Sequence, residues 1–271
     1  MKYKQNLHTH TVFGDGIDTP EQIVQHALSK NFNSLGFSEH SYMFYSPKPC
    51  LKPEQTLKYK NEITHLKSKY SDRLDIYMGL EVDMYSQIDL SDYDYLIGSC
   101  HYFKFGETYV GFDRSINECQ RIIQEYFGGD GMRFAKEYYR QYAKLCQFGN
   151  FDIIGHFDLI TKNNSSNCLF DEDSKEYINA AFETMESFRG KIALFEVNTG
   201  SIARGYRSRP YPAIKLLTEF RNMKFGAVIT SDCHDGRLLD CGFEEARNLL
   251  KYCGFTERYV LTNTGFMAVA L

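Results

Sequence analysis

Six of the eight histidines in the sequence stand at or just after the end of a short apolar run. A single residue separates His8 from His10, and a single residue separates Asp232 from His234. Because side chains alternate between the two faces of a strand, the members of each pair lie on one face and can hold one ion together. The complete set of residues with this ligand chemistry is His8, His10, Asp15, His40, Glu81, His101, His156, Asp232 and His234. Imidazole and carboxylate groups without thiolate are typical of Zn²⁺, Fe²⁺ or Mn²⁺ sites.

A structural explanation is available for each of these residues taken alone. A single histidine at a strand end is commonly a hydrogen-bonded surface group, and Glu81 or Asp232 alone would be typical of a helix cap. That explanation would have to hold separately at seven strand ends. Gathering so many ionisable groups without cations would also cost several kcal/mol per buried group. We therefore predict a metal site, and expect structural roles for His26 and His65, which fall in helical stretches.

Short apolar runs alternate with longer amphipathic stretches along the chain, which is typical of βα units. The sequence predicts strands over 3–7, 34–37, 74–80, 95–99, 151–155, 192–197 and 225–230, and 259–261 is either an eighth strand or a tail. It predicts helices over 20–28, 53–70, 115–147 with a break at 128–131, 174–188, 211–222 and 243–252. This number of units in 271 residues favours a closed α/β barrel over an open sheet. In such a barrel the strand C-terminal ends meet on one face, which brings the candidate ligands together.

Composition narrows the class of protein. The net charge is −4 and the isoelectric point is about 6.1, so no basic field favours a nucleic-acid or anionic-membrane partner. No apolar run approaches the roughly 20 residues of a membrane span, and no apolar stretch follows the first lysines, so we expect a cytoplasmic protein. The eight cysteines contain no C-x-x-C pair. We interpret them as small buried residues, neither disulfides nor metal ligands.

The ordered motifs resemble those of the PHP (polymerase and histidinol phosphatase) superfamily. The matching segments are His8-Thr9-His10 with Asp15-Gly16, Ser38-Glu39-His40, Gly79-Leu80-Glu81, Ser99-Cys100-His101, Gly155-His156-Phe157-Asp158, Glu196-Val197-Asn198 and Ser231-Asp232-Cys233-His234. The opening H-T-H-T-x-F-x-D-G, the S-E-H block and the chain length resemble the histidinol-phosphate phosphatase branch. The resemblance implies a distorted (β/α)7 TIM-like barrel, with residues 1–271 as one PHP-type catalytic domain and the metal site at the strand C-terminal ends.

The resemblance also implies a centre of three divalent ions. A first ion would be held by His8, His10, Glu81 and Asp232, and a second by Glu81, His101 and His156. The third would take Asp15, His40 and His234. The implied reaction is hydrolysis of L-histidinol phosphate, a step of histidine biosynthesis, by a metal-activated hydroxide, with Asp232, Glu81 and His234 at the reacting centre. The partner would be a small phosphomonoester.

A phosphate dianion also calls for cationic side chains beyond the metals. Three arginines follow the sixth predicted strand, and of these we favour Arg204 and Arg207, together with Lys162. For the substrate amine the candidates are Asp83 and Asp158, while Glu39 could equally orient a ligand histidine.

Other functions remain open from the sequence. The nearest alternative is a phosphoesterase acting on another small phosphomonoester, a phosphotyrosyl peptide or a nucleotide end. A non-catalytic metal-binding module is disfavoured because all nine ligand positions are filled, and an amidohydrolase because no lysine stands at a suitable strand end.

Overall fold

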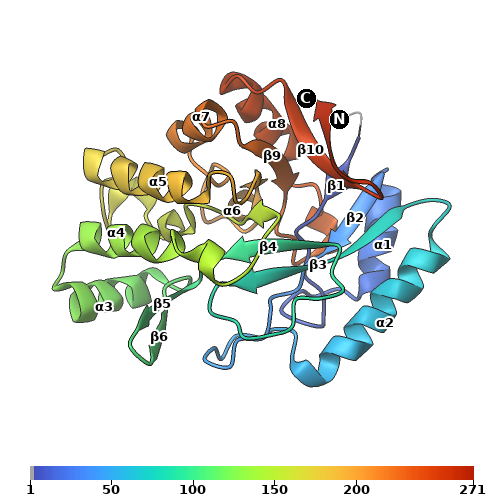
Figure 1. The fold of residues 1–271 in the computed structure, drawn as a ribbon, viewed down its shortest axis with the longest axis horizontal. Coiled ribbons are helices and arrows are strands. Elements are labelled where there is room, and N and C mark those ends of the chain that lie inside the picture. Colours follow the sequence, from blue (N-terminus) through green and yellow to red (C-terminus); the bar gives the residue numbers. More distant parts are fainter. Residues whose placement is uncertain (1–2) are drawn as a thin grey trace.

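The computed structural model describes residues 3–271, and its centre is a seven-stranded parallel barrel wrapped by helices (Figure 1). The strands, in spatial order, are β1 (Gln5–Asn6), β2 (Ser34–Phe37), β3 (Asp75–Asp83), β4 (Tyr95–Ser99), β7 (Ile153–Ile154), β8 (Leu194–Asn198) and β9 (Gly226–Thr230). The barrel closes just beyond β1 and β9, where the His10 amide donates to the Cys233 carbonyl (2.8 Å) and the Cys233 amide to the His8 carbonyl (3.0 Å). The predicted seven-stranded barrel is therefore confirmed, and its distortion lies in the two-residue strands β1 and β7.

The helices follow the predicted pattern closely, apart from the four-residue helix Gly200–Ala203, which lies in a stretch predicted as a loop. They are α1 (Pro20–Ser29), α2 (Pro53–Lys69), α3 (Ile116–Phe127), α4 (Gly131–Tyr142), α5 (Lys175–Phe188), α6 (Gly200–Ala203), α7 (Ile214–Asn222) and α8 (Phe243–Tyr252), with 3-10 turns at Leu145–Gln147, Leu159–Thr161, Ser165–Asn167 and Gly236–Leu238. The hydroxyl of Thr19 accepts from the Gln22 amide and fixes the start of α1. Gly128, at a φ of 65°, ends α3 in the left-handed conformation, and Asp130 then caps α4.

Three segments differ from the sequence prediction. Helix α7 begins at Ile214 because Tyr211 precedes a proline and pairs in extended conformation with Asn198 (amide to carbonyl, 2.8 and 2.9 Å). A hairpin of β5 (Tyr102–Phe105) and β6 (Thr108–Gly111) stands between β4 and α3. The last apolar stretch is neither an eighth barrel strand nor a tail, since β10 (Glu257–Thr262) pairs with β11 (Gly265–Ala270) in a separate sheet.

The barrel interior is filled by side chains and closed at its N-terminal end by this last hairpin, which lies beside the start of β1 in Figure 1. Leu261 of β10 packs with inward-facing residues of the barrel strands, and its amide and carbonyl bond the Gln5 side chain (both 2.8 Å). Tyr95 crosses the interior and donates to the Leu7 carbonyl (2.5 Å). Gly36 and Gly79 make room for it, because a Cβ at either would lie within 2.3 Å of the tyrosine side chain. The interior is therefore solid below the strand C-terminal ends.

The cysteines fit the predicted role in part. Cys50, Cys100, Cys119, Cys233 and Cys253 are buried, and all eight are free thiols, but Cys168 is exposed. None of the helices in residues 3–271 combines the length and apolar character that crossing a bilayer requires.

Candidate metal centre

The predicted ligands converge at the C-terminal mouth of the barrel. His8 and His10 follow β1, His40 follows β2, and Glu81 belongs to β3. The remaining ligands from strand ends are His101, His156, Asp232 and His234, and Asp15 comes from the loop after β1. Seven of the nine are buried, while the Asp15 and His234 side chains retain 27% and 23% exposure. His26 lies on α1 and His65 is exposed on α2, outside the cluster, as the sequence predicts.

Glu81 is at the centre of this cluster. Its Oε1 lies 2.7 Å from His156 Nε2 and 3.4 Å from His101 Nε2. Its Oε2 lies 2.7 Å from His40 Nδ1, 3.3 Å from His8 Nε2 and 3.6 Å from His10 Nε2. One buried carboxylate therefore faces five imidazoles, which is the arrangement expected of a bridging ligand.

Three subsets of ligand atoms are close enough to hold a common ion, each within 4.8 Å of one another. They are His8, His10 and Asp232; His10, Asp15, His40 and His234; and His40, Glu81 and His101. His156 joins the centre through its contact with Glu81. The cluster therefore offers sites for more than one divalent cation.

The hydrogen bonding of these groups fits bound cations. Six atoms of ligand residues are buried without a hydrogen-bond partner within residues 3–271: His8 Nε2, His10 Nδ1 and Nε2, Asp15 Oδ1, Glu81 Oε2 and His156 Nδ1. Several of them lie within ion-pair distance of an opposite group but lack hydrogen-bond geometry. Since buried polar atoms in native proteins are nearly always satisfied, these atoms point to ligands that complete them. Divalent metal ions match this donor set.

The electrostatics of the cluster agree with this interpretation. Burial opposes ionisation of Glu81, but the neighbouring imidazoles, His40 foremost, hold its pKa well below the ordinary value. Burial together with the nearby His234 and His40 rings lowers the pKa of His10 to about 3. The central carboxylate is therefore ionised and His10 is neutral, which are the protonation states that metal ligation needs. Burial opposes protonation of His8, His40 and His101, but neighbouring carboxylates raise the pKa of all three rings, so a metal ion bound there would displace their protons.

A second layer of carboxylates orients the ligand histidines. Glu196 is fully buried, and its Oε2 lies 2.8 Å from His8 Nδ1. Asp83 Oδ2 accepts from the His101 amide (2.9 Å) and lies 3.3 Å from His101 Nδ1. Such contacts fix the tautomer of a ligand imidazole and direct its other nitrogen toward the metal. The sequence placed Glu196 in a motif but indicated no role for it.

A cavity of about 200 Å³ opens over the cluster, and Arg204 and Lys162 line it. Arg204 Nη2 bonds Asp232 Oδ2 (2.7 Å), and its Nη1 lies 2.9 Å from His234 Nδ1. Arg207 is different: it pairs with both oxygens of Glu172 (2.8 and 3.1 Å) and donates to the Thr161 carbonyl (2.5 Å). The Arg207 side chain therefore bonds Glu172 and the Thr161 carbonyl, and Arg207 does not line the cavity.

The carboxylates considered for the substrate amine, Asp83 and Asp158, and for orienting a ligand histidine, Glu39, are also bonded within the protein. Asp158 is fully buried and accepts from Arg209 (3.2 Å) and the Ala213 amide (3.0 Å). Glu39 accepts from the Thr11 amide and hydroxyl (2.8 and 2.6 Å), and burial raises its pKa to about 8. Neither lines the cavity, nor does Asp83.

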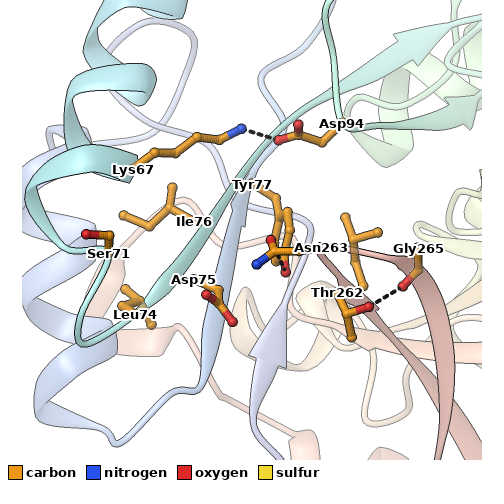
Figure 2. Close-up of a pocket in the computed structure, with 11 residues that line it drawn as sticks. Lys67, Ser71, Leu74, Asp75, Ile76, Tyr77, Asp94, Thr262, Asn263 and Gly265 are labelled. Atoms are coloured by element: carbon orange, nitrogen blue, oxygen red, sulfur yellow. Dashed lines mark hydrogen bonds and ion pairs between the residues drawn. The ribbon is translucent and has the colours of Figure 1, made fainter.

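A second hollow lies at the opposite end of the barrel, between α2, the start of β3 and the turn of the β10–β11 hairpin (Figure 2). Its Asp94 forms an ion pair with Lys67 at 2.5 Å, which Figure 2 marks with a dashed line. The metal-ligand groups gather at the mouth and not here.

Comparison with known proteins agrees with this geometry. The model of the PHP domain matches residues 6–200. The chain belongs to the PHP domain family. Its fold is that of a histidinol phosphate phosphatase from Lactococcus lactis, complexed with zinc, L-histidinol and phosphate, with a TM-score of 0.71 at 22% identity over 97% of this chain and 98% of that one. The family resemblance drawn from the motifs is therefore confirmed.

Two curated relatives extend over most of this PHP chain. A protein of Schizosaccharomyces pombe named probable histidinol-phosphatase is 26% identical over 262 residues, covering 87% of this chain and 81% of its own length. The histidinol-phosphatase of Bacillus subtilis is 26% identical over 255 residues, covering 85% and 93%. Both matches extend well beyond isolated motifs.

Proposed function

We propose that this PHP protein is a metal-dependent phosphatase that hydrolyses L-histidinol phosphate to L-histidinol and inorganic phosphate. The observation that carries the proposal is the set of buried imidazole and carboxylate atoms around Glu81 that lack hydrogen-bond partners within residues 3–271. The names of the relatives and the ligands of the Lactococcus lactis structure support the choice of substrate. We propose further that this reaction is a step of histidine biosynthesis and that the protein acts in the cytoplasm.

The proposed centre holds three divalent ions, zinc, iron or manganese. His8, His10, Glu81 and Asp232 would hold the first, and two of the observed ligand subsets support the first and third groups. Glu81 would be shared with a second ion held by His101 and His156. Asp15, His40 and His234 would hold the third. The contact of Glu81 with five imidazoles supports the shared position.

When bound, divalent ions supply Lewis acidity toward the phosphate oxygens and a water of lowered pKa. The chain itself contributes position and charge. Arg204, bonded to Asp232 at 2.7 Å, stands at the edge of the ligand cluster and lines the cavity. Lys162 adds a second cation on the cavity wall. We assign Asp232, Glu81 and His234 to the reacting centre, because Asp232 and His234 line the cavity and Glu81 contacts five of the ligand imidazoles.

The competing function keeps this centre and changes the substrate, to another small phosphomonoester or a phosphotyrosyl peptide. The two are separated by measuring kcat/KM for histidinol phosphate against a panel of phosphomonoesters and a phosphotyrosyl peptide, with elemental analysis of the same sample. We expect bound divalent metal and a preference for histidinol phosphate well above about tenfold, the ratio that roughly 1.4 kcal/mol of differential binding gives. A preference of about tenfold or less would contradict the biosynthetic assignment. Full activity in a metal-free sample would contradict the proposed chemistry.

A further inference from the structure

Three charged side chains from three separate loops meet on the wall of the cavity. Lys48 lies between β2 and α2, Asp113 follows β6, and Lys162 follows the 3-10 turn Leu159–Thr161. Lys48 Nζ donates to Asp113 Oδ2 (2.8 Å) and to the Asp113 carbonyl (3.0 Å). Lys162 Nζ donates to Asp113 Oδ1 (2.5 Å). All three line the cavity that also contains Arg204 and the ligand histidines.

This arrangement holds two ammonium groups side by side. Each oxygen of the Asp113 carboxylate is engaged by one lysine, so the carboxylate is neutralised and the two cations are anchored. An ammonium has three N–H donors. Lys48 uses two of them on Asp113, and Lys162 uses one there while its Nζ faces the Tyr206 ring at 4.5 Å. At least one N–H of each lysine therefore remains for a ligand in the cavity.

The group is partly shielded from water, which strengthens its interactions. The side chains of Lys48, Asp113 and Lys162 are 26%, 13% and 14% exposed. Burial alone would raise the pKa of Asp113, but the two lysines hold it well below the ordinary value. The cluster carries one net positive charge, and it faces a cavity whose other cation, Arg204, is already paired with Asp232.

We propose that Asp113 is a positioning residue that presents Lys48 and Lys162 as paired donors to the phosphate group of the substrate. Lys48 is then a phosphate-binding residue in addition to Arg204 and Lys162. The inference rests on the proposed phosphatase function and identifies which wall of the cavity receives the phosphate. Without the Asp113 carboxylate the two ammonium groups repel each other and lose their common partner, because no other group in residues 3–271 bonds both; only the Asp113 carbonyl still accepts from Lys48.

The direction in which Asp113→Asn changes the affinity for phosphate distinguishes this role from two others. If Asp113 were only an anion in the cavity, Asp113→Asn would strengthen phosphate binding by removing repulsion. If Asp113 bound the substrate amine, Asp113→Asn would raise KM for histidinol phosphate and leave the affinity for inorganic phosphate unchanged. If Asp113 positions the lysines, the same change weakens the binding of inorganic phosphate although it removes a negative charge.

The experiment measures the dissociation constant of inorganic phosphate by calorimetry on metal-loaded protein, and its Ki against histidinol phosphate. We expect Lys48→Gln and Asp113→Asn each to weaken phosphate binding about tenfold, the size of one hydrogen bond to a charged group. The matched control is Lys52→Gln, which removes the same charge from an exposed lysine of the same connection outside the cavity lining, and should change binding less than about twofold. The double variant with Lys48→Gln and Asp113→Asn should bind phosphate little worse than either single variant, because both changes remove the same pair of lysine donors.

Unchanged or tighter phosphate binding in Asp113→Asn, with melting temperature and metal content as in the wild type, would overturn the proposal. Equal losses in Lys48→Gln and Lys52→Gln would overturn it as well, because they would reveal only a general charge effect. If Asp113→Asn does not fold, Lys48→Gln against Lys52→Gln still decides. If the wild type binds phosphate in this manner but does not turn over histidinol phosphate, the proposed substrate fails while the phosphate site stands.

Discussion

The Glu196→Gln variant tests whether buried carboxylates set the metal affinity of the centre through the histidine tautomer. Glu196 Oε1 accepts from the His156 amide (2.6 Å) and the Asn198 side-chain amide (2.9 Å), and both partners can only donate there. A glutamine must therefore keep its oxygen at this position and turn its NH₂ group toward His8 Nδ1. The His8 ring then has to accept at Nδ1 and carry its proton on Nε2, the nitrogen that faces Glu81 and Asp232.

That exchange of tautomer blocks one ligand atom without changing the shape of the site. Loss of such a supporting contact typically lowers metal affinity by about 10- to 100-fold, or about 1.4 to 2.7 kcal/mol. The assay is titration of metal-free protein with Zn²⁺ against a competing chelator, followed by kcat at saturating metal. We expect the loss in metal affinity, with kcat largely restored once metal is in excess.

The matched control is Thr230→Val, which removes a hydrogen bond to Glu196 Oε2 (2.7 Å), the oxygen that contacts His8, but leaves the carboxylate and the His8 tautomer intact. It should weaken metal binding far less than Glu196→Gln. Wild-type metal affinity in Glu196→Gln, or equal losses in the two variants, would refute the tautomer argument.

Three further substitutions test other parts of the site. Glu81→Ala leaves five imidazoles without their shared carboxylate, so metal analysis should show loss of two ions. Turnover should fall by at least about 100-fold, because a bound metal ion supplies several kcal/mol of transition-state stabilisation. Full metal content would contradict the bridging role. Arg204→Ala should raise KM and lower kcat with metals retained, whereas Arg207→Ala should chiefly lower the melting temperature, because Arg207 is paired with Glu172. Steady-state kinetics and thermal melts of both variants test this expectation. The reverse pattern would show that Arg207, and not Arg204, acts on the substrate. His65→Ala, on the exposed face of α2, should leave kcat/KM unchanged, and a large loss would show that the site is misplaced.

The strands and the ligand residues could be predicted because both follow local rules. A parallel strand leaves an apolar run in the sequence, and a ligand at its end has a fixed place relative to that run, as with His101 after β4. The hairpin β5–β6 was missed although the Gly106-Glu107 pair stands between its two strands, because hairpin pairing does not fit the βα pattern used to divide the chain.

The second layer of the site could not be predicted, because its contacts join residues far apart in sequence. Lys48 is 65 residues from Asp113, and His8 is 188 residues from Glu196. Neither pairing leaves a periodic signal, and only the folded barrel brings these groups together. The same reason explains why Arg207 was wrongly expected to line the cavity. The loop composition indicated a cation near the mouth of the barrel, but it did not indicate that Arg207 would form an ion pair with Glu172.

The barrel is closed by the same short segments that carry its metal ligands. The hydrogen bonds that join the first strand to the last involve His8, His10 and Cys233, between the ligand pairs His8–His10 and Asp232–His234. A cation held by both pairs would link the first barrel strand to the last. Its removal would loosen the wall of the barrel at one place, so amide exchange in the chelated protein should rise first along this junction, while the apolar interior around Tyr95 stays protected.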